Sequence, residues 1–143
     1  MFKTILVPID IYAASPPVQQ LGVAKRFAEA NGGKIIVVYA LPVVPGYAQS
    51  VLPSGTHANV LAEAKKKLEE IATSAELSGQ AELVLLEGNP ARAILDHANE
   101  VEADLIIMAS HDPNITDYLI GSTASRVVHH AHCSMFIVRN LKD

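Results

Sequence analysis

The sequence has a single cysteine, no tryptophan and only three phenylalanines among its 143 residues. With Cys133 alone, no intrachain disulfide can form, and this fits a reducing compartment. No apolar run approaches the ~18–20 residues that a membrane helix needs. The N-terminal segment reaches Asp10 before an apolar stretch of signal-peptide length develops. We therefore expect a cytoplasmic protein with no membrane partner.

Charged residues are also scarce. They make up 18% of the chain, and the formal net charge is −4. A protein that binds nucleic acid without regard to sequence normally has a basic surface. The longest basic run, Lys65 to Lys67, is followed by Glu69 and Glu70 at the i,i+4 spacing of a solvated helix face. The charge pattern therefore predicts no nucleic-acid partner.

Short apolar runs alternate with longer segments of helical periodicity along the whole chain. Hydrophobic residues make up 50% of the sequence, enough for the core of one domain over residues 1–143. The apolar runs cover residues 5–9, 35–40, 81–86, 105–109 and 135–138. This alternation predicts an α/β fold, a doubly wound five-stranded parallel sheet with helices on both faces. The third run is flanked by glutamates, which suits an edge strand.

Helices are expected between these runs. Ser15-Pro16 and Asn89-Pro90 each combine a capping residue with a proline at the first helical position. The helix between the second and third runs is expected over about residues 59–77, with its stop at Gly79. The residues expected to face inward are Val18, Leu21, Ala24 and Ala28; Leu61, Ala64, Leu68, Ile71, Ala72 and Ala75; Ile94, Leu95, Ala98 and Val101; and Ala124, Val127, Val128 and Ala131.

A ligand of such a sheet binds beyond the carboxyl ends of the strands. No glycine occurs between Asp10 and Pro17, which excludes a Gly-x-Gly-x-x-Gly dinucleotide motif, and the chain has no P-loop. A response-regulator receiver is excluded because the third run ends in Glu87-Gly88 where a phosphoacceptor aspartate is needed. Asp10 has two interpretations: it accepts from a ribose hydroxyl or holds a divalent cation, or it caps the loop into the first helix.

The segment after the fourth run contains the most candidate ligand groups. Gly121-Ser122-Thr123 begins a helix, and the free N–H groups of a helix start, with two hydroxyls beside them, form an anion site without lysine. The alternative is ordinary N-capping by Ser122 or Thr123. Spacing alone leaves both interpretations open.

His129, His132 and Cys133 have the i, i+3, i+4 spacing at which helical side chains share a soft metal ion. Their place at the expected end of the fourth helix favours instead histidines beside the helix carbonyls and an inward, apolar Cys133. We therefore predict no metal site here. No nucleophile has an evident base, and no lysine or arginine occurs between Arg92 and Arg126, so we expect no dedicated kinase or ATPase.

Several of these segments together resemble the universal stress protein family. Residues 4–10 are similar to the family's opening, residues 87–90 to its Gly-x-Pro helix start, and residues 109–139 to its signature block. The loop from Ala109 resembles the F and G type of bacterial member. The resemblance covers the whole chain. It implies strand order 3-2-1-4-5, a homodimer through the last strand, residues 133–139, and ATP binding in the nucleotide-binding subset.

The resemblance also implies which residues would bind the nucleotide. They are Pro8, Ile9, Asp10, Ala40, Ala109, Ser110, His111, Gly121, Ser122 and Thr123. The first three are implied to lie near the ribose and adenine, with Asp10 able to reach a nucleotide-bound Mg. The Ala40 backbone is implied to contact the adenine. Residues 109–111 would line the phosphate turn, and residues 121–123 would hold the phosphates.

The chain departs from the family motif Gly-x2-Gly-x9-Gly-Ser/Thr at two of its glycines. Ala109 stands at the first and Asp112 at the second, and the loop is one residue shorter than in the family. Asp112 brings a negative charge to a place where phosphate is expected. Two further functions therefore stay open: a nucleotide-independent dimeric interaction protein of the same family, and a slow ATPase or autokinase.

Overall fold

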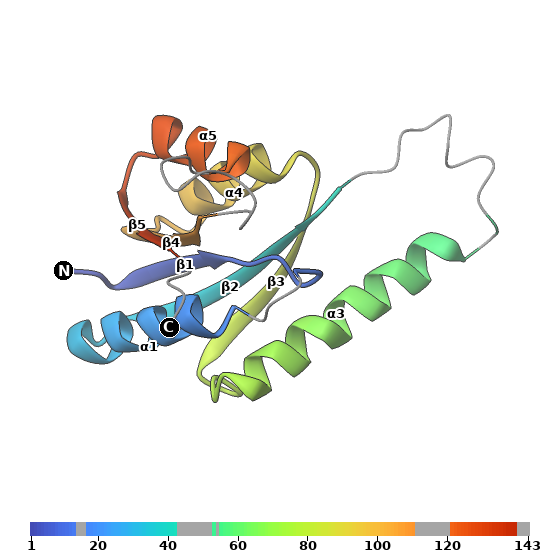
Figure 1. The fold of residues 1–143 in the computed structure, drawn as a ribbon, viewed down its shortest axis with the longest axis horizontal. Helices are drawn as coiled ribbons and strands as arrows, with labels where there is room; N and C mark the ends of the chain where they lie inside the picture. The colour runs from blue at the N-terminus through green and yellow to red at the C-terminus, as the bar shows by residue number, and fades with distance from the viewer. Residues whose placement is uncertain (14–16, 43–52, 54, 111–120, 140–143) are drawn as a thin grey trace.

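The computed structural model describes residues 1–13, 17–42, 53, 55–110 and 121–139. Within them five parallel strands form one sheet in the order β3-β2-β1-β4-β5 (Figure 1). The strands are β1 (Thr4–Pro8), β2 (Lys34–Leu41), β3 (Ala81–Glu87), β4 (Leu105–Ala109) and β5 (Ser134–Val138). The predicted fold class and strand order are confirmed, and β3 lies at an edge as expected. No helix in the described residues has the length and apolar character needed to cross a membrane.

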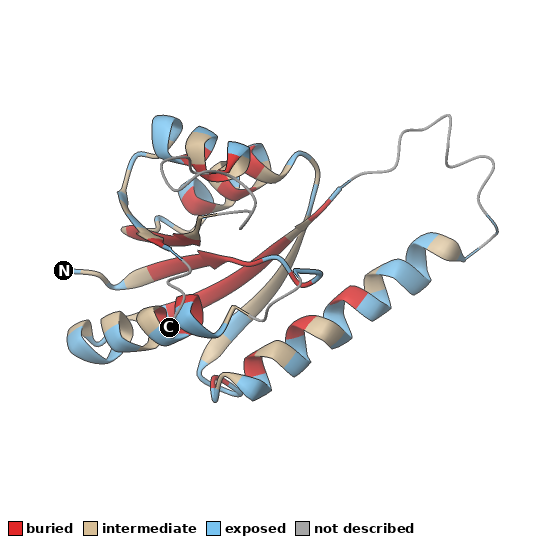
Figure 2. Ribbon diagram, viewed as in Figure 1, coloured by how far each residue is buried: buried red, intermediate tan, exposed pale blue. Residues whose placement is uncertain are grey.

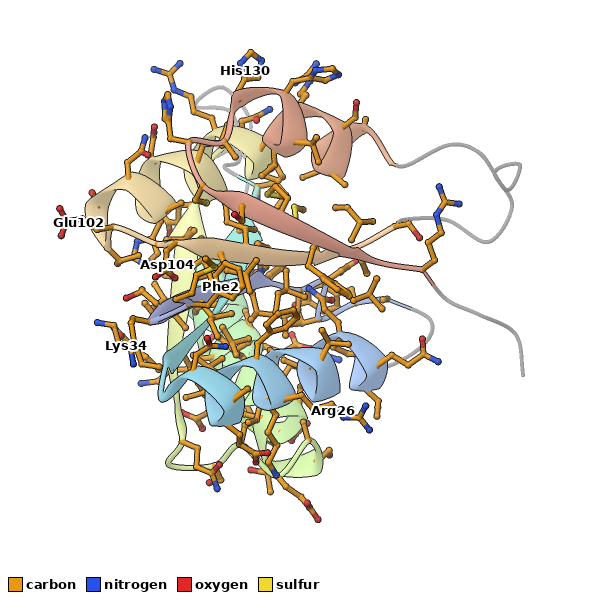
Figure 3. All side chains as sticks on the ribbon, turned by 90° about the vertical axis from the view of Figure 1, so that its left-hand side faces the viewer. Phe2, Arg26, Lys34, Glu102, Asp104 and His130 are labelled. Carbon is orange, nitrogen blue, oxygen red and sulfur yellow. The ribbon has the colours of Figure 1, made fainter. Side chains whose placement is uncertain are left out.

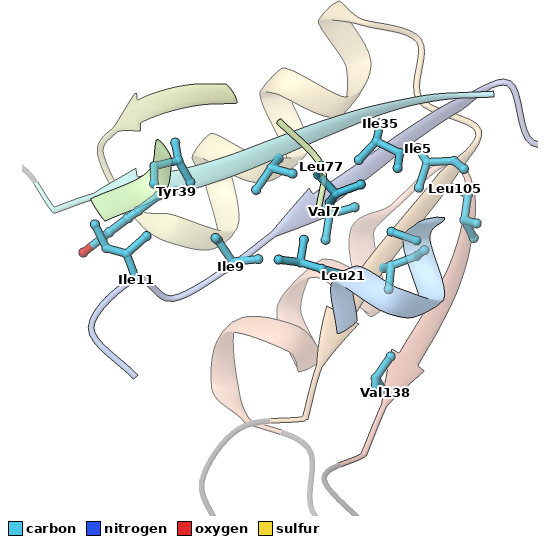
Figure 4. Packing of buried hydrophobic residues seen from close by; sticks show 14 of the residues in the cluster. Ile5, Val7, Ile9, Ile11, Leu21, Ile35, Tyr39, Leu77, Leu105 and Val138 are labelled. Atoms are coloured by element: carbon cyan, nitrogen blue, oxygen red, sulfur yellow. The ribbon is translucent and has the colours of Figure 1, made fainter. Parts of the chain in front are cut away.

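Helices cover both faces of the sheet. Helices α1 (Val18–Asn31) and α3 (Thr56–Ser74) lie on one face, and α4 (Pro90–Glu100) and α5 (Ser122–His130) lie on the other (Figure 1). Because successive side chains of a strand point to opposite faces, Ile5 and Val7 of β1 pack in the core under α1 and α3 (Figure 4). Leu6, between them, packs in the core under α4 and α5. The central strands are buried on both faces, whereas the outer surfaces of the helices are exposed (Figure 2).

The helix starts agree in part with the capping signals. The side chain of Asn89 accepts a hydrogen bond from the Arg92 amide at 3.2 Å, and Pro90 is the first helical residue, so this predicted start is confirmed. Ser15 and Pro16 lie outside the described residues, and α1 itself begins at Val18.

The predicted end of the long helix at Gly79 is wrong. Helix α3 ends at Ser74, and the chain then passes through a left-handed conformation at Glu76, with φ of 60°. The Leu77 amide donates to the Ala72 carbonyl at 2.8 Å, and the Leu77 side chain is fully buried. The helix therefore ends early enough for the reversed chain to bring Leu77 into the core.

Two residues expected on inward faces are exposed. Val18 is 60% exposed and Val128 is 39% exposed, so both predictions are wrong. In α1 the buried residues are Gln20, Leu21 and Ala24. The buried face of the helix is therefore centred nearer to Gln20 than the apolar pattern predicts, and Val18 lies at its margin. The other residues predicted to face inward are buried or half-buried.

Hydrogen bonds to the backbone connect the strands at the end of the sheet where they begin. The Asp104 carboxylate accepts from the amides of Lys3 at 2.8 Å and Thr4 at 3.0 Å. The Lys34 amide donates to the Lys3 carbonyl at 2.9 Å. Figure 3 shows Phe2, Lys34 and Asp104 gathered at this end. Any ligand site at the switch point therefore lies at the opposite end, where the strands finish.

Candidate functional site

The pairing of β1 with β4 ends before the carboxyl ends of the two strands, where Pro8 has no N–H to donate. Strand β1 pairs with β2 as far as Pro8, opposite Val38, but pairs with β4 only as far as Leu6, opposite Ile106. From β1 the next strand in sequence, β2, lies on one side, and β4 lies on the other side. The gap between the carboxyl ends of β1 and β4 is therefore the topological switch point of the sheet. A pocket of about 290 Å³ lies there, close to the lower end of the range of ~300–1,000 Å³ usual for small-molecule sites.

The structure brings seven of the ten sequence-predicted site residues together around this pocket. They come from the end of β1, the end of β2, the end of β4 and the start of α5. These residues are Pro8, Ile9, Asp10, Ala40, Ala109, Ser122 and Thr123. Segments far apart in the sequence thus meet at one site, because the carboxyl ends of parallel strands lie at one edge of the sheet.

Of the other three predicted residues, Ser110 and Gly121 are described and are not among the residues that line the pocket. The Ser110 amide donates to the Val138 carbonyl at 2.9 Å, which continues the pairing of β4 with β5. Gly121 is buried, and its carbonyl accepts from the Ser125 amide at 2.9 Å in the first turn of α5. His111, and the departing residue Asp112, lie outside the described residues.

The start of α5 is capped by backbone only. Gly121 is the N-cap residue, with extended backbone and no side-chain cap hydrogen bond, and the first turn contains no acidic residue. Ser122 and Thr123 are the first helical residues, so the interpretation of either as the N-cap is wrong. Both line the pocket, and the N-cap residue Gly121 offers no side chain to the amides of the first helical turn. Such a helix start favours an anion through its N–H groups and its dipole.

Asp10 makes the turn contact of its capping interpretation and also lies at the pocket. Its Oδ1 accepts from the Tyr12 amide at 2.9 Å, which fixes the turn after β1, and the residue is exposed and lines the pocket. A carboxylate has a second oxygen, so the turn and a ligand can be served together. Burial, then the charge of Asp10 and the neighbouring Tyr12, raise the pKa of Tyr39 in the same wall, so its phenol stays neutral at physiological pH.

Other lining residues were not identified from the sequence as site residues. Ile94 and Pro90 of α4 had been recognised only as an inward-facing residue and a helix start. Gln20 was not identified from the sequence at all. It is 3% exposed, and its Nε2 donates to the Pro8 carbonyl at 2.6 Å and to the Ile107 carbonyl at 2.9 Å. An apolar wall with a few fixed polar groups is typical of small-molecule sites.

The histidine and cysteine residues near the end of α5 are arranged differently from a metal centre. Within the part of the chain that the structure describes, no group of three or more His, Cys, Asp or Glu side chains could hold a metal ion. Cys133 is half-buried against the core under α4 and α5. Burial, and secondly the charge of Asp104, raise the pKa of its thiol, so the less reactive protonated form predominates at neutral pH.

Comparison with known sequences gives one family over almost the whole chain. The family model described as Universal stress protein family matches residues 1–139. The Thermus aquaticus protein named Universal stress protein in QAH/OAS sulfhydrylase 3'region is 34% identical over 143 residues, covering 97% of this chain and 100% of that protein. Universal stress protein G of Salmonella typhimurium is 28% identical over 151 residues, with coverage of 97% and 100%.

Solved structures share the fold. A crystal structure of a universal stress protein in complex with cAMP has a TM-score of 0.66 and 22% identity, and covers 98% of both chains. The universal stress protein from Archaeoglobus fulgidus in complex with dAMP has a TM-score of 0.66 and 22% identity, covering 95% of this chain and 97% of that one. At these identities the likeness confirms the architecture of the sheet and its helices.

Proposed function

We propose that this chain, a member of the universal stress protein family, binds ATP in the pocket at the carboxyl ends of β1, β2 and β4. In this proposal residues 1–143 form one domain. The family match and the relative named universal stress protein G confirm the resemblance that was predicted from the sequence. The observation that carries the proposal is that a helix start whose N-cap residue makes no side-chain hydrogen bond meets the ends of β1 and β2 around one pocket. Two structural neighbours that are complexes with cAMP and dAMP support it.

In the proposed pose the nucleotide extends across the strand ends. The adenine lies at the end of β2 against the Ala40 backbone, and the ribose lies near Pro8 and Asp10. The phosphates lie at Ser122 and Thr123, held by main-chain N–H groups and hydroxyls. Asp10 has an oxygen left for a nucleotide-bound Mg. Ser110 and His111 keep the phosphate-turn role, and Gly121 the phosphate-holding role, that the family resemblance implies.

The proposed role is regulatory binding in the cytoplasm. Among the described residues, those that line the pocket include no lysine, arginine or histidine to stabilise a phosphoryl group in transfer. Helix amides can hold phosphate without accelerating its reaction, because they bind ground state and transition state alike. The presence of a single cysteine, Cys133, fits the proposed reducing compartment. We therefore expect occupancy by nucleotide, rather than turnover, to be the signal.

Calorimetric titration with ATP and magnesium tests this proposal. We expect saturable binding of one nucleotide per chain, with a rise in the melting temperature as ATP is added, because the ligand binds only the folded state. Inorganic tripolyphosphate is the matched control, since it lacks the base and ribose. No heat and no thermal shift at millimolar ATP would refute ATP binding and favour the nucleotide-independent interaction protein. Release of ADP during the titration would favour the slow ATPase instead.

We also propose a homodimer through residues 133–139. Strand β5 is an edge strand of the described sheet, and its Phe136 is 39% exposed despite its ring contact with Phe27 at 5.4 Å. An unpaired edge with an apolar side chain is suited to pairing with a second copy. Sedimentation equilibrium is expected to give about twice the chain mass for the wild type and a monomer for Phe136→Lys. Val128→Lys, at an equally exposed position on α5, should remain dimeric. A monomeric wild type would contradict the proposal.

A further inference from the structure

We propose that Gln20 is a ligand-positioning residue whose side-chain carbonyl accepts a hydrogen bond from a ribose hydroxyl of the nucleotide. The inference rests on the proposed ATP site and adds a contact within it. Gln20 lies in the first turn of α1 and lines the pocket from the floor of the gap between β1 and β4. Among the described residues it is the one polar side chain in the buried class.

Two hydrogen bonds fix the orientation of the Gln20 carboxamide. Its Nε2 donates to the Pro8 carbonyl at 2.6 Å and to the Ile107 carbonyl at 2.9 Å. Both acceptors are carbonyl oxygens, so the atom that faces them is the NH₂ group, and both of its hydrogens are used. The remaining polar atom of the side chain is Oε1, which can only accept.

Oε1 is the polar atom of Gln20 that remains for a ligand, because Gln20 lines the pocket and its Nε2 is used by Pro8 and Ile107. None of the described residues donates a hydrogen bond to Oε1. Among the described residues, the one fully buried side-chain atom without a hydrogen-bond partner is His97 Nε2, so Oε1 does not belong to that class. An acceptor with no donor among the described residues, on a side chain that is 3% exposed and lines the pocket, is a place for a donor on the ligand.

The early end of the pairing between β1 and β4 explains why a glutamine is held here. The ladder between them ends at Leu6, opposite Ile106, so beyond that point the Pro8 and Ile107 carbonyls have no partner across the gap. Buried carbonyls require hydrogen bonds, and the Gln20 amide supplies one to each. The same two bonds hold Oε1 in one position, so the acceptor is ready before a ligand arrives.

The sheet order indicates which part of the nucleotide meets Oε1. Strand β1 lies between β2 and β4. With the adenine at Ala40 on β2 and the phosphates at the start of α5, which follows β4, the ribose crosses the gap where Gln20 lies. A carbonyl oxygen repels phosphate oxygens but accepts from a hydroxyl. The ribose 2′ and 3′ hydroxyls are therefore the matching donors.

Comparison of ATP with 2′,3′-dideoxyATP tests the contact. Wild-type protein is expected to bind ATP about tenfold more tightly than the dideoxy analogue, because the analogue leaves a buried acceptor unpaired. Gln20→Met, similar in length but without a polar atom, should reduce this ratio to about twofold. Gln20→Met also removes the donors to the Pro8 and Ile107 carbonyls. That structural loss lowers the affinity for ATP and for the analogue by the same factor, so it does not by itself alter the ratio of the two affinities. Gln19→Met, at the exposed neighbouring position, should keep the wild-type ratio.

The outcomes separate this inference from the proposed function. An unchanged ratio in Gln20→Met, or a wild-type ratio near one, overturns the ribose contact while ATP binding stands. Failure of the wild type to bind either nucleotide overturns both. With 2′-deoxyATP and 3′-deoxyATP, the analogue whose affinity Gln20→Met lowers least identifies, by its missing hydroxyl, the group that Oε1 accepts from.

Discussion

Gly33→Ala is expected to lower the free energy of unfolding by about 3 kcal/mol, at the upper end of the usual cost of overpacking. Gly33 immediately precedes β2, and a Cβ there would press against the Phe2 carbonyl oxygen and lie 3.3 Å from the Lys3 carbonyl oxygen. Both obstacles are backbone atoms. The Lys34 amide and the Asp104 carboxylate hold this stretch by hydrogen bonds to Lys3 and Thr4, so it cannot retreat without breaking them.

Urea unfolding followed by circular dichroism measures this effect. Gly22→Ala is the matched control, since a Cβ at Gly22, inside α1, meets nothing within 4 Å. That variant is expected to gain about 0.5–1 kcal/mol, the ordinary preference for alanine over glycine within a helix. Equal midpoints for Gly33→Ala and the wild type would show that the two strands are not in close contact there. The end of the sheet where the strands begin is remote from the pocket, so folded Gly33→Ala should keep its ligand affinity.

The elements of the fold could be predicted wherever a local signal agrees with the packing. The apolar runs become the strands, and Asn89-Pro90 opens α4 because the cap hydrogen bond needs only residues within one turn. The end of α3 could not be predicted. The chain leaves the helix at Ser74 to bury Leu77, a tertiary gain that outweighs the left-handed conformation of Glu76. Gly79, the local signal, serves a later turn.

The candidate site was predictable in its backbone positions and less so in its walls. Strand ends and a helix start can be located from the sequence, which is why Asp10 and Ser122 were identified from the residues themselves, whereas Ala40 was implied only by the family resemblance. Gln20 was missed because hydropathy counts it as a solvent-facing residue. Its burial depends on two carbonyls, at Pro8 and Ile107, that become neighbours only once the sheet forms. A polar residue within an apolar helical stripe is the one signal that could have marked it.

Ser122→Glu is expected to weaken ATP binding about a hundredfold while slightly stabilising the protein. Ser122 is exposed, lines the pocket and is the first residue of α5. A carboxylate near the phosphates would add repulsion of roughly 1–4 kcal/mol for a charge pair about 4 Å apart, between the limits of water and a protein surface. The same charge at a helix N-terminus is favourable by about 0.3–1 kcal/mol through the helix dipole. Affinity and stability therefore change in opposite directions, which general damage to the fold cannot produce.

Calorimetry with three ligands and two further variants isolates the cause. Ser125→Glu adds the same charge to the first turn of α5 at a residue that does not line the described pocket, and Ser122→Gln adds similar bulk without charge; both should retain most of the ATP affinity. Loss of affinity in Ser122→Glu should be greatest for ATP, smaller for AMP and absent for adenosine, because repulsion grows with phosphate charge. It should also shrink in 1 M salt, where the Debye length falls to about 3 Å. If Ser122→Glu and Ser125→Glu bind ATP equally well, the phosphates do not lie at the start of α5, and the proposed orientation of the nucleotide is wrong.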